Sequence, residues 1–160
     1  VDMSFIGKEL LFGSSLTTGS ENIPEGHYAE ENMKSTVVPN RNMILISLAA
    51  GYAISIGAEI LFYGAHAGDH TIYPDCRPEF ISAMQDVLKL CDWTPVMLRA
   101  PYSGFTKGDI AVRGKTLNVD YGLTWTCYKG TEKPCGKCGS CTEREEAFLF
   151  AEMPDPLTKD

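Results

Sequence analysis

Four cysteines in the last quarter of the sequence constrain the fold of this chain more than any other feature. They follow the spacing C-x7-C-x2-C-x2-C and are Cys127, Cys135, Cys138 and Cys141. A disulfide between cysteines three residues apart closes a very tight loop, whereas four thiolates at this spacing can converge tetrahedrally on one soft cation. We therefore expect this segment to fold around a metal ion.

Zinc is the metal that this ligand set favours. A closed shell of four sulfur atoms leaves no open coordination position and suits a redox-silent structural ion. Gly136 and Gly139 each follow a cysteine, where the backbone must turn tightly and direct its N–H groups at sulfur. Lys133 and Lys137 would offset the remaining negative charge. Two alternatives stay open: an iron–sulfur cluster, since C-x2-C-x2-C also occurs in ferredoxin-type ligation, and a cluster of free thiols.

The composition of the chain is that of one compact globular domain. Of its 160 residues, 44% are hydrophobic and 22% are charged. Asp and Glu outnumber Lys and Arg by 21 to 14, and the resulting net charge of -7 disfavours binding to nucleic acid. The most apolar stretch, residues 43–58, is interrupted by polar residues and glycine, so we expect no membrane span. Without a signal-type N-terminal segment, the expected compartment is the cytoplasm.

Helices and strands alternate in the central part of the chain. Helices are expected over residues 41–56, 77–90 and 110–117, and strands over residues 59–64 and 96–100. The first strand is a nearly continuous apolar run, which is typical of a strand buried on both faces of a parallel sheet. The first helix is apolar around most of its circumference, with Asn40 expected to cap it and Gly57 to end it. This alternation predicts an α/β fold.

A ligand is expected beyond the carboxyl ends of the two strands, in the loops 64–76 and 101–106. His66 and His70 lie in the first of these loops, and we expect them to line a pocket rather than bind a metal. Two strands are too few for a stable open sheet, even if residues 1–5 add a third. We therefore expect that another chain supplies strands, that self-association covers the edge, or that the sequence is part of a longer protein.

Three motifs resemble those of the 7-cyano-7-deazaguanine synthase family and occur in the family's order. Residues 38–42, V-P-N-R-N, are similar to the family motif V-P-G-R-N. Residues 69–80 are similar to D-Y-S-G-Y-P-D-C-R-P-E-F and match its last eight positions without a change. Residues 124–128, the cysteines that follow and Arg144 resemble the family's C-terminal zinc signature. The resemblance extends over residues 1–153.

This resemblance implies a fold, a reaction and a set of ligands. The fold is a parallel-sheet PP-loop fold, Rossmann-like and related to the adenine nucleotide hydrolases. Residues 1–160 would form a single domain, in which residues 1–123 form the substrate half and residues 124–153 the zinc-binding segment. The implied reaction is the ATP-dependent conversion of 7-carboxy-7-deazaguanine and ammonia to 7-cyano-7-deazaguanine, a queuosine precursor. ATP with magnesium would be the co-substrate, and zinc would be structural.

The chain also departs from the family pattern. The S-G-G-x-D-S loop, whose glycines allow backbone N–H groups to surround pyrophosphate, does not occur in the 160 residues. We therefore expect an N-terminally incomplete fold and a truncated or split enzyme, with a homodimer or a partner chain supplying the missing half. Asn40 replaces the motif glycine, and residues 70–72 replace Y-S-G, where the bulk of Ile72 is expected to reshape the base pocket.

The family motifs imply roles for six residues outside the metal segment. The candidate catalytic residues are Asp69 and Asp75, which would bind the guanine-like N–H edge or orient ammonia. The candidate substrate-binding residues are Arg41, Tyr73, Arg77 and Lys107. Among these, Arg41 would meet a carboxylate or phosphate, Tyr73 would stack on the base and Lys107 would contact phosphate. The plainer alternatives are a helix cap for Asp75, a surface ion pair for Arg77 and a solvated lysine at position 107.

Two other functions stay open. The first is a non-catalytic module that binds a deazapurine without turning over ATP. The second is an iron–sulfur PP-loop relative that modifies tRNA, which predicts a brown protein with a restricted basic patch. Cys91, which stands apart from the cluster, is expected to be a small buried hydrophobic residue.

Overall fold

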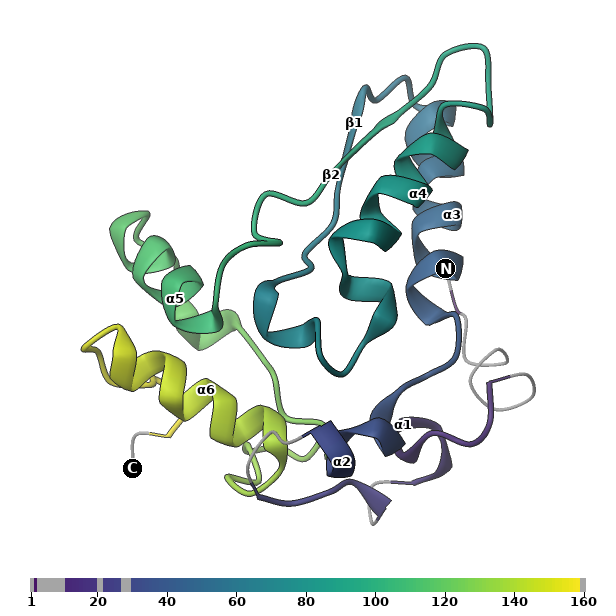
Figure 1. The fold of residues 1–160 in the computed structure, drawn as a ribbon. Coiled ribbons are helices and arrows are strands. Elements are labelled where there is room, and N and C mark those ends of the chain that lie inside the picture. Colours follow the sequence, from purple (N-terminus) through teal and green to yellow (C-terminus); the bar gives the residue numbers. More distant parts are fainter. Residues whose placement is uncertain (1, 3–10, 20–21, 27–29, 159–160) are drawn as a thin grey trace. The chain divides into compact units, whose positions relative to one another are not determined.

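The computed structural model describes residues 2, 11–19, 22–26 and 30–158 (Figure 1). Two compact units make up the chain, one of residues Asn40–Thr106 and the other of residues Val1–Pro39 with Lys107–Asp160. The N-terminal residues that were expected to add a strand lie outside the described residues, except residue 2. The assignment of residues 1–160 to one domain with a boundary at residue 123 stays a prediction.

The unit Asn40–Thr106 has the predicted alternation of helices and strands. Its elements are α3 (Arg41–Ser55), β1 (Ile60–Phe62), α4 (Pro78–Leu88) and β2 (Met97–Arg99), with 3-10 turns at Ala67–Asp69 and Pro74–Cys76. The two strands pair in parallel, with Leu61 opposite Leu98. The mixed α/β class and the parallel pairing predicted from the sequence are therefore confirmed.

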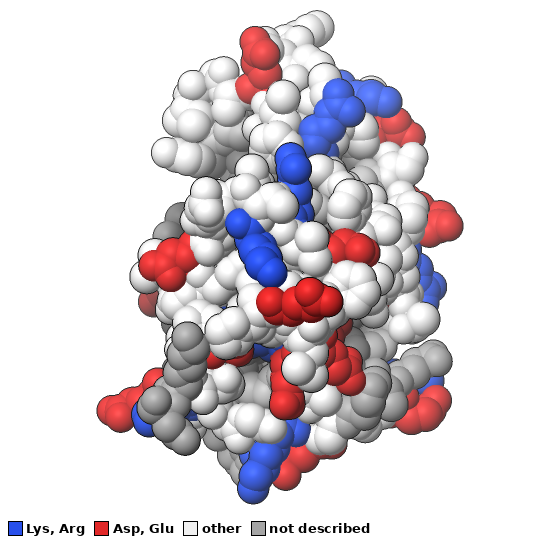
Figure 2. All heavy atoms as spheres, turned by 90° about the vertical axis from the view of Figure 1, so that its left-hand side faces the viewer, with Lys and Arg blue, Asp and Glu red and all other residues white. Residues whose placement is uncertain are grey.

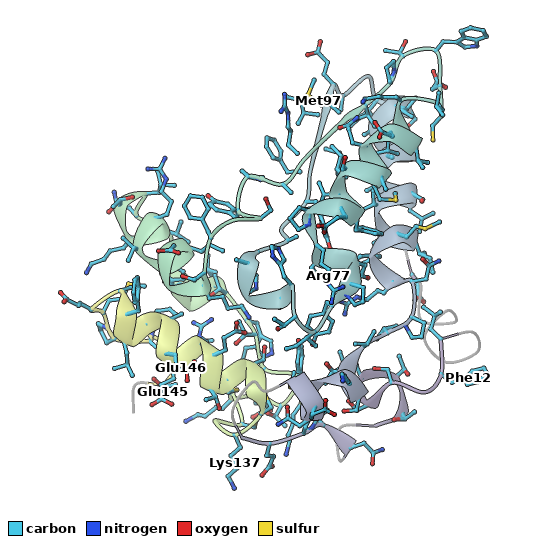
Figure 3. All side chains as sticks on the ribbon, in the orientation of Figure 1. Phe12, Arg77, Met97, Lys137, Glu145 and Glu146 are labelled. Atoms are coloured by element: carbon cyan, nitrogen blue, oxygen red, sulfur yellow. The ribbon has the colours of Figure 1, made fainter. Side chains whose placement is uncertain are left out.

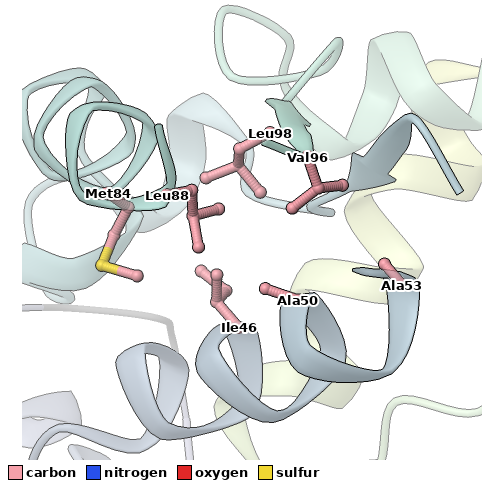
Figure 4. Packing of buried hydrophobic residues seen from close by; sticks show 7 residues of the cluster. All are labelled: Ile46, Ala50, Ala53, Met84, Leu88, Val96 and Leu98. Atoms are coloured by element: carbon pink, nitrogen blue, oxygen red, sulfur yellow. The ribbon is translucent and has the colours of Figure 1, made fainter. Parts of the chain in front are cut away.

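Both helices of this unit pack on one face of the strand pair. Figure 4 shows the cluster they form, which consists of Ile46, Ala50, Ala53, Met84, Leu88, Val96 and Leu98. Leu88 is 2% exposed and Val96 1%. Burial of an aliphatic side chain of this size stabilises a fold by about 2 kcal/mol, so this cluster is the main source of stability of the unit.

The other face of the strands is not buried as the sequence predicted. Ile60 is 43% exposed and Phe62 is 68% exposed. Alternate residues of a strand point to opposite faces, and α3 and α4 cover only the face of Leu61. The expectation of burial on both faces was wrong for this reason. The same holds for α3, whose outer side chains Leu48 and Tyr52 are exposed.

The two ends of α3 are held differently from each other. Asn40 does not cap the helix through its side chain, which corrects the prediction, because its backbone is left-handed with φ of 58°. Instead, the carboxylate of Asp75 accepts a hydrogen bond from the backbone N–H of Asn42 at 3.4 Å. At the other end Gly57 has φ of 70°, and the N–H of the next residue donates to the carbonyl of Ala53. Gly57 therefore ends the helix as predicted.

Cys91 is exposed, so its predicted burial was wrong. It lies three residues beyond the end of α4, where its thiol donates to the carbonyl of Val87 at 3.3 Å. Helix α4 has already ended at this point. Cys91 therefore does not belong to the apolar face of α4 that packs into the core.

The second unit is helical in the residues that the structure describes. It contains α1 (Ser15–Thr18), α2 (Glu30–Met33), a 3-10 turn at Lys34–Thr36, α5 (Lys107–Thr116) and α6 (Gly139–Phe150). Helices α5 and α6 pack through the small residues Ala111, Ala147 and Ala151. The sequence analysis did not predict α6. Among the described residues, no helix is both long and apolar enough to cross a membrane.

Candidate metal centre and candidate substrate site

The four cysteines of the C-terminal motif come together in the structure. Their sulfur atoms all lie within 4.8 Å of one another, and the Sγ atoms of Cys135 and Cys141 are 3.9 Å apart. Four sulfur atoms at 2.3 Å from a tetrahedral zinc ion are separated by about 3.8 Å. The arrangement therefore fits a single metal ion, and the predicted clustering of these residues is confirmed.

Backbone N–H groups are directed at the sulfur atoms, as the glycine spacing suggested. The N–H of Cys135 donates to Sγ of Cys127, and the N–H of Cys138 donates to Sγ of Cys135, both at 3.4 Å. Gly136 makes the intervening turn with φ of 67°. Burial acts to raise the pKa of the Cys135 thiol, but backbone hydrogen bonds from Lys137 and Cys138 outweigh it and lower the pKa to about 7. The Cys135 thiol thus ionises more readily than an ordinary cysteine.

A segment far away in the sequence closes over the cysteines. Ile23 is buried against the sulfur cluster, and Glu25 forms an antiparallel bridge with Cys138. The N–H of Gly26 donates to the carbonyl of Lys137 at 2.8 Å, while the side chain of Lys137 extends away from the loop (Figure 3). Glu25 also pairs with Lys129 at 2.6 Å. Residues 22–26 therefore form one wall of the candidate metal centre, which the sequence analysis did not foresee.

Helix α6 begins inside the metal motif and is anchored at its middle. Arg144 and Asp155, both buried, form a bidentate ion pair with N···O distances of 2.6 and 2.8 Å. The remaining guanidinium N–H groups donate to Thr124 and to the carbonyl of Tyr121. All five donors of Arg144 are thereby used within the protein. Arg144, part of the family's zinc signature, fastens the chain before the first cysteine to α6.

A second group of motif residues lies at the carboxyl ends of β1 and β2. The N–H of Ala67 donates to the carbonyl of Phe105 at 2.8 Å, which joins the two loops in which a ligand was expected. Asn42, from the motif at residues 38–42, also contacts the motif at residues 69–80, because its side-chain amide lies 3.7 Å from Sγ of Cys76. Two residues 34 positions apart in the sequence thus join the two motifs in one cluster.

The buried thiol of Cys76 is the centre of this cluster. The hydroxyl of Tyr63, the residue after β1, lies 3.5 Å from Sγ and donates to the carbonyl of Asp75 at 2.9 Å. Burial raises the pKa of the Cys76 thiol to about 11, with the carboxylates of Asp69 and Asp75 adding to the effect and Arg41 opposing it. Cys76 is therefore a neutral thiol at physiological pH and is not an activated nucleophile.

Asp69 is held by a buried histidine of the same loop. Nε2 of His66 lies 3.2 Å from a carboxylate oxygen of Asp69, and Nδ1 of His66 accepts the N–H of Gly68 at 3.1 Å. The side chains of His66 and Asp69 are 8% and 19% exposed. The carboxylate is thus fixed by the protein while part of it still meets solvent.

The remaining candidate residues differ in their surroundings. Tyr73 is 6% exposed, and its carbonyl accepts the N–H of Cys76. Arg77, labelled in Figure 3, donates through Nε to the carbonyl of His70 at 2.7 Å and so links both ends of the loop. Lys107 belongs to the other unit, where its ammonium group pairs with Glu143 of α6. The roles of these three residues toward a substrate stay predictions.

Tyr63 and Asp155 are residues that sequence reasoning missed. Tyr63 follows an apolar strand, and its position at the carboxyl end of that strand could have indicated that it lies near a ligand site. Asp155 lies in an irregular tail and carried no signal. On the face that Figure 2 shows, Lys and Arg side chains are interspersed with Asp and Glu side chains.

Comparisons with known proteins agree with the motifs. A family model described as queuosine biosynthesis protein QueC matches residues 1–152. The chain is 64% identical over 144 residues to a 7-cyano-7-deazaguanine synthase of Methanoregula boonei, covering 90% of this chain and 66% of the relative. The synthases of Hahella chejuensis and Caldicellulosiruptor bescii are 60% and 57% identical over 157 residues, which cover 98% of this chain and 67% and 70% of those relatives. The chain thus spans about two thirds of their length.

Proposed function

The chain belongs to the family of queuosine biosynthesis protein QueC, and from this premise we propose that it contains the substrate half of a 7-cyano-7-deazaguanine synthase. One observation carries the proposal. The residues 73–80, which match the family motif without a change, contact the V-P-N-R-N motif through Cys76 and Asn42 at the carboxyl ends of parallel strands. This is where open α/β sheets bind their ligands.

The proposed reaction converts the carboxylate of 7-carboxy-7-deazaguanine to a nitrile. A carboxylate is a poor electrophile, so ATP first activates it as an acyl adenylate or acyl phosphate, and ammonia displaces the activating group to give an amide. A second activation of the amide oxygen allows that oxygen to leave as the nitrile forms. Both carboxyl oxygens depart on ATP-derived groups, and the nitrogen comes from ammonia. The protein must hold both ligands in line and stabilise charge on the transferring groups.

Within this proposal the residues around Cys76 bind the deazapurine. Asp69 and Asp75 supply carboxylates for the N–H edge of the base or for ammonia, and Arg41 supplies a guanidinium for the carboxylate or phosphate. Asp75 also accepts a hydrogen bond from the first turn of α3, the helix that begins with Arg41. In this proposal Asp75 therefore both holds the start of that helix and faces the ligand. The fold would be of the PP-loop class, with ATP and magnesium as co-substrate.

We further propose that the four cysteines hold one structural zinc ion. The sulfur spacing and the closed ligand set support zinc, which supplies folding energy when bound and takes no part in the chemistry. The same ligands also fit an iron–sulfur cluster, which would make the purified protein brown. We also propose that a homodimer or a partner chain supplies the ATP half. Light scattering after size-exclusion chromatography measures the molar mass of the assembly and so tests for the homodimer.

Isothermal titration of the zinc-loaded 160-residue chain tests the proposed function. The acid 7-carboxy-7-deazaguanine is expected to bind, and Asp75→Ala is expected to weaken its binding at least about tenfold, since a hydrogen bond to a charged group is lost. Asp86→Ala is the matched control, because Asp86 lies exposed on α4 and pairs with the exposed Lys89 at 2.8 Å. Unchanged affinity in Asp75→Ala would contradict the site.

Titration with Mg-ATP then separates the alternatives. Binding of the acid together with ATP supports the synthase, and formation of the nitrile follows by mass spectrometry. Binding of the acid without ATP would mean that the chain is half of an active site, as a fragment, a subunit that depends on a partner chain or the deazapurine-binding module would be. A brown protein containing iron would favour the iron–sulfur relative that acts on tRNA.

A further inference from the structure

His66 makes two different contacts through its two ring nitrogens. It stands at the start of the 3-10 turn Ala67–Asp69, where Nδ1 accepts the backbone N–H of Gly68. Nε2 lies 3.2 Å from the carboxylate of Asp69. The residue as a whole is 6% exposed, so both contacts are sheltered from water.

These contacts fix the tautomer of the ring. A nitrogen that accepts an N–H group carries no proton, so the proton of the neutral imidazole is on Nε2 and is donated to Asp69. Protonation of the ring would place a second N–H at Nδ1 against the N–H of Gly68. The geometry therefore describes a histidine that accepts at Nδ1 and can donate from Nε2 to the carboxylate of Asp69.

The backbone of Asp69 is held as firmly as its side chain. Its carbonyl accepts the N–H groups of Ile72 and Tyr73 at 3.1 and 2.8 Å, and its own N–H donates to the carbonyl of His66. The carboxylate is thus fixed from both ends and keeps part of its surface open to solution. A charged acceptor that is oriented before binding recognises groups that donate N–H hydrogen bonds.

We propose that His66 is a positioning residue, which orients the carboxylate of Asp69 toward the amino and ring N–H groups of an aminopyrimidinone base. This inference rests on the proposed function, because it takes the deazapurine as the ligand. It adds a residue outside the motif that carries the resemblance, since His66 lies upstream of residues 69–80.

A merely structural role is the alternative, in which His66 only caps the turn through Nδ1. Two substitutions separate the roles because each keeps one of the contacts. In His66→Asn, the amide oxygen takes the place of Nδ1 and accepts the N–H of Gly68, but the side chain is too short to reach Asp69. In His66→Gln, the amide nitrogen takes the place of Nε2 and can still donate to Asp69.

The experiment measures the affinity of the 160-residue chain for 7-carboxy-7-deazaguanine by isothermal titration. We expect His66→Gln to bind within about threefold of the original chain and His66→Asn about tenfold more weakly, the size of one charge-assisted hydrogen bond. In the background of Asp69→Asn, the two His66 variants are expected to bind equally, since there is no longer a carboxylate to orient. Equal affinities of His66→Asn and the original chain would overturn the proposal, as would a His66→Gln variant as weak as His66→Asn.

Nitrogen-15 NMR of the histidine ring gives a second measurement on the unchanged chain. A proton on Nε2 of His66 is expected, and a proton on Nδ1 would overturn the proposal even if a variant fails to fold. If the original chain does not bind the acid, the proposed function fails. The position of the proton on the His66 ring then decides separately whether His66 can donate to Asp69 and orient it.

Discussion

Asn40 illustrates how one backbone angle accounts for a departure from the family motif. Its φ of 58° lies in the left-handed region, which glycine adopts without a steric penalty and asparagine tolerates better than most residues. The family motif has glycine at this position, so asparagine preserves the path of the backbone into α3. The replacement therefore concerns the start of the helix and does not by itself imply a different substrate.

Substitution of Asn40 tests this explanation. Asn40→Gly is expected to raise the free energy of unfolding by up to about 1 kcal/mol, because glycine removes the remaining strain. Asn40→Ala is expected to lower it by about 1 kcal/mol, because alanine adopts this conformation less readily. Urea unfolding followed by circular dichroism measures both. Equal free energies of unfolding for the alanine and glycine variants would show that the positive φ of residue 40 has no effect on stability.

The buried pair of Arg144 and Asp155 makes stability depend on pH. Burial acts to raise the pKa of Asp155, but hydrogen bonds from Arg144 and from the N–H of Leu157 lower it below its usual value. The ionised carboxylate therefore stabilises the native state above the pKa of an unfolded Asp, about 3.9, and this stabilisation is lost as the pH falls through the lower native pKa.

Asp155→Asn should expose that dependence. At pH 6 we expect a loss of about 3 kcal/mol in the free energy of unfolding, because the guanidinium of Arg144 stays buried without its counter-charge. The difference from the original chain should shrink as the pH falls below about 4. Urea titrations at a series of pH values measure it. The control is Asp86→Asn, which removes the exposed pair with Lys89 and should change nothing measurable; a difference for Asp155→Asn that is constant with pH would contradict the argument.

At the scale of elements, two glycines inside helices have opposite surroundings. Gly114 of α5 packs against the hydroxyl of Tyr121, which donates to the carbonyl of Ala111, and a Cβ atom at Gly114 would overlap that ring. Gly51 of α3 has open space where a Cβ atom would lie. Neither has a positive φ, so the two sites differ in packing and not in backbone strain.

Alanine at each position separates packing from helix propensity. Gly114→Ala is expected to lower the free energy of unfolding by about 1–3 kcal/mol, since Tyr121 must move and lose its hydrogen bonds. Gly51→Ala is expected to raise it by about 0.5–1 kcal/mol, since alanine favours the helix and meets nothing. Thermal unfolding of both variants measures the effects. If Gly114→Ala also raised the free energy of unfolding, Gly114 would not be packed closely against Tyr121, and the argument would be wrong.

The elements that the sequence revealed are those with a strong local pattern. The strands Ile60–Phe62 and Met97–Arg99 lie inside the predicted ranges because apolar runs between turn residues are local signals. Helix α6 was missed because most of its buried residues are polar, small or cysteine, and only Ala147 and Phe148 belong to an apolar pattern. The cysteine cluster could be predicted from spacing alone. The contacts of Asp75 with Asn42 and of Arg144 with Asp155 could not, since they depend on how distant segments fold together.

At the scale of the whole molecule, the candidate metal centre and the candidate substrate site belong to different units. All four cysteines and the segment 22–26 lie in the unit that contains α5 and α6, while Cys76 and its neighbours lie in Asn40–Thr106. The hydrophobic cluster of α3, α4 and β2 contains none of the four cysteines. A metal ion bound by these cysteines should therefore stabilise one unit directly and leave the core of the other intact.

Removal of the metal tests this separation through hydrogen exchange. Chelation, or Cys138→Ser, is expected to speed exchange of the Gly26 N–H at least about tenfold, because its acceptor, the carbonyl of Lys137, lies in the loop that a metal bound by the cysteines would organise. The N–H groups of Tyr63 and Met97, which bond to Arg99 and Glu59 across the strands, should keep their protection. Equal loss of protection in both sets would mean that the metal supports the whole chain as one cooperative unit. Selective loss would mean that the candidate substrate site can form without metal, so any binding of the acid measured on chelated protein should persist.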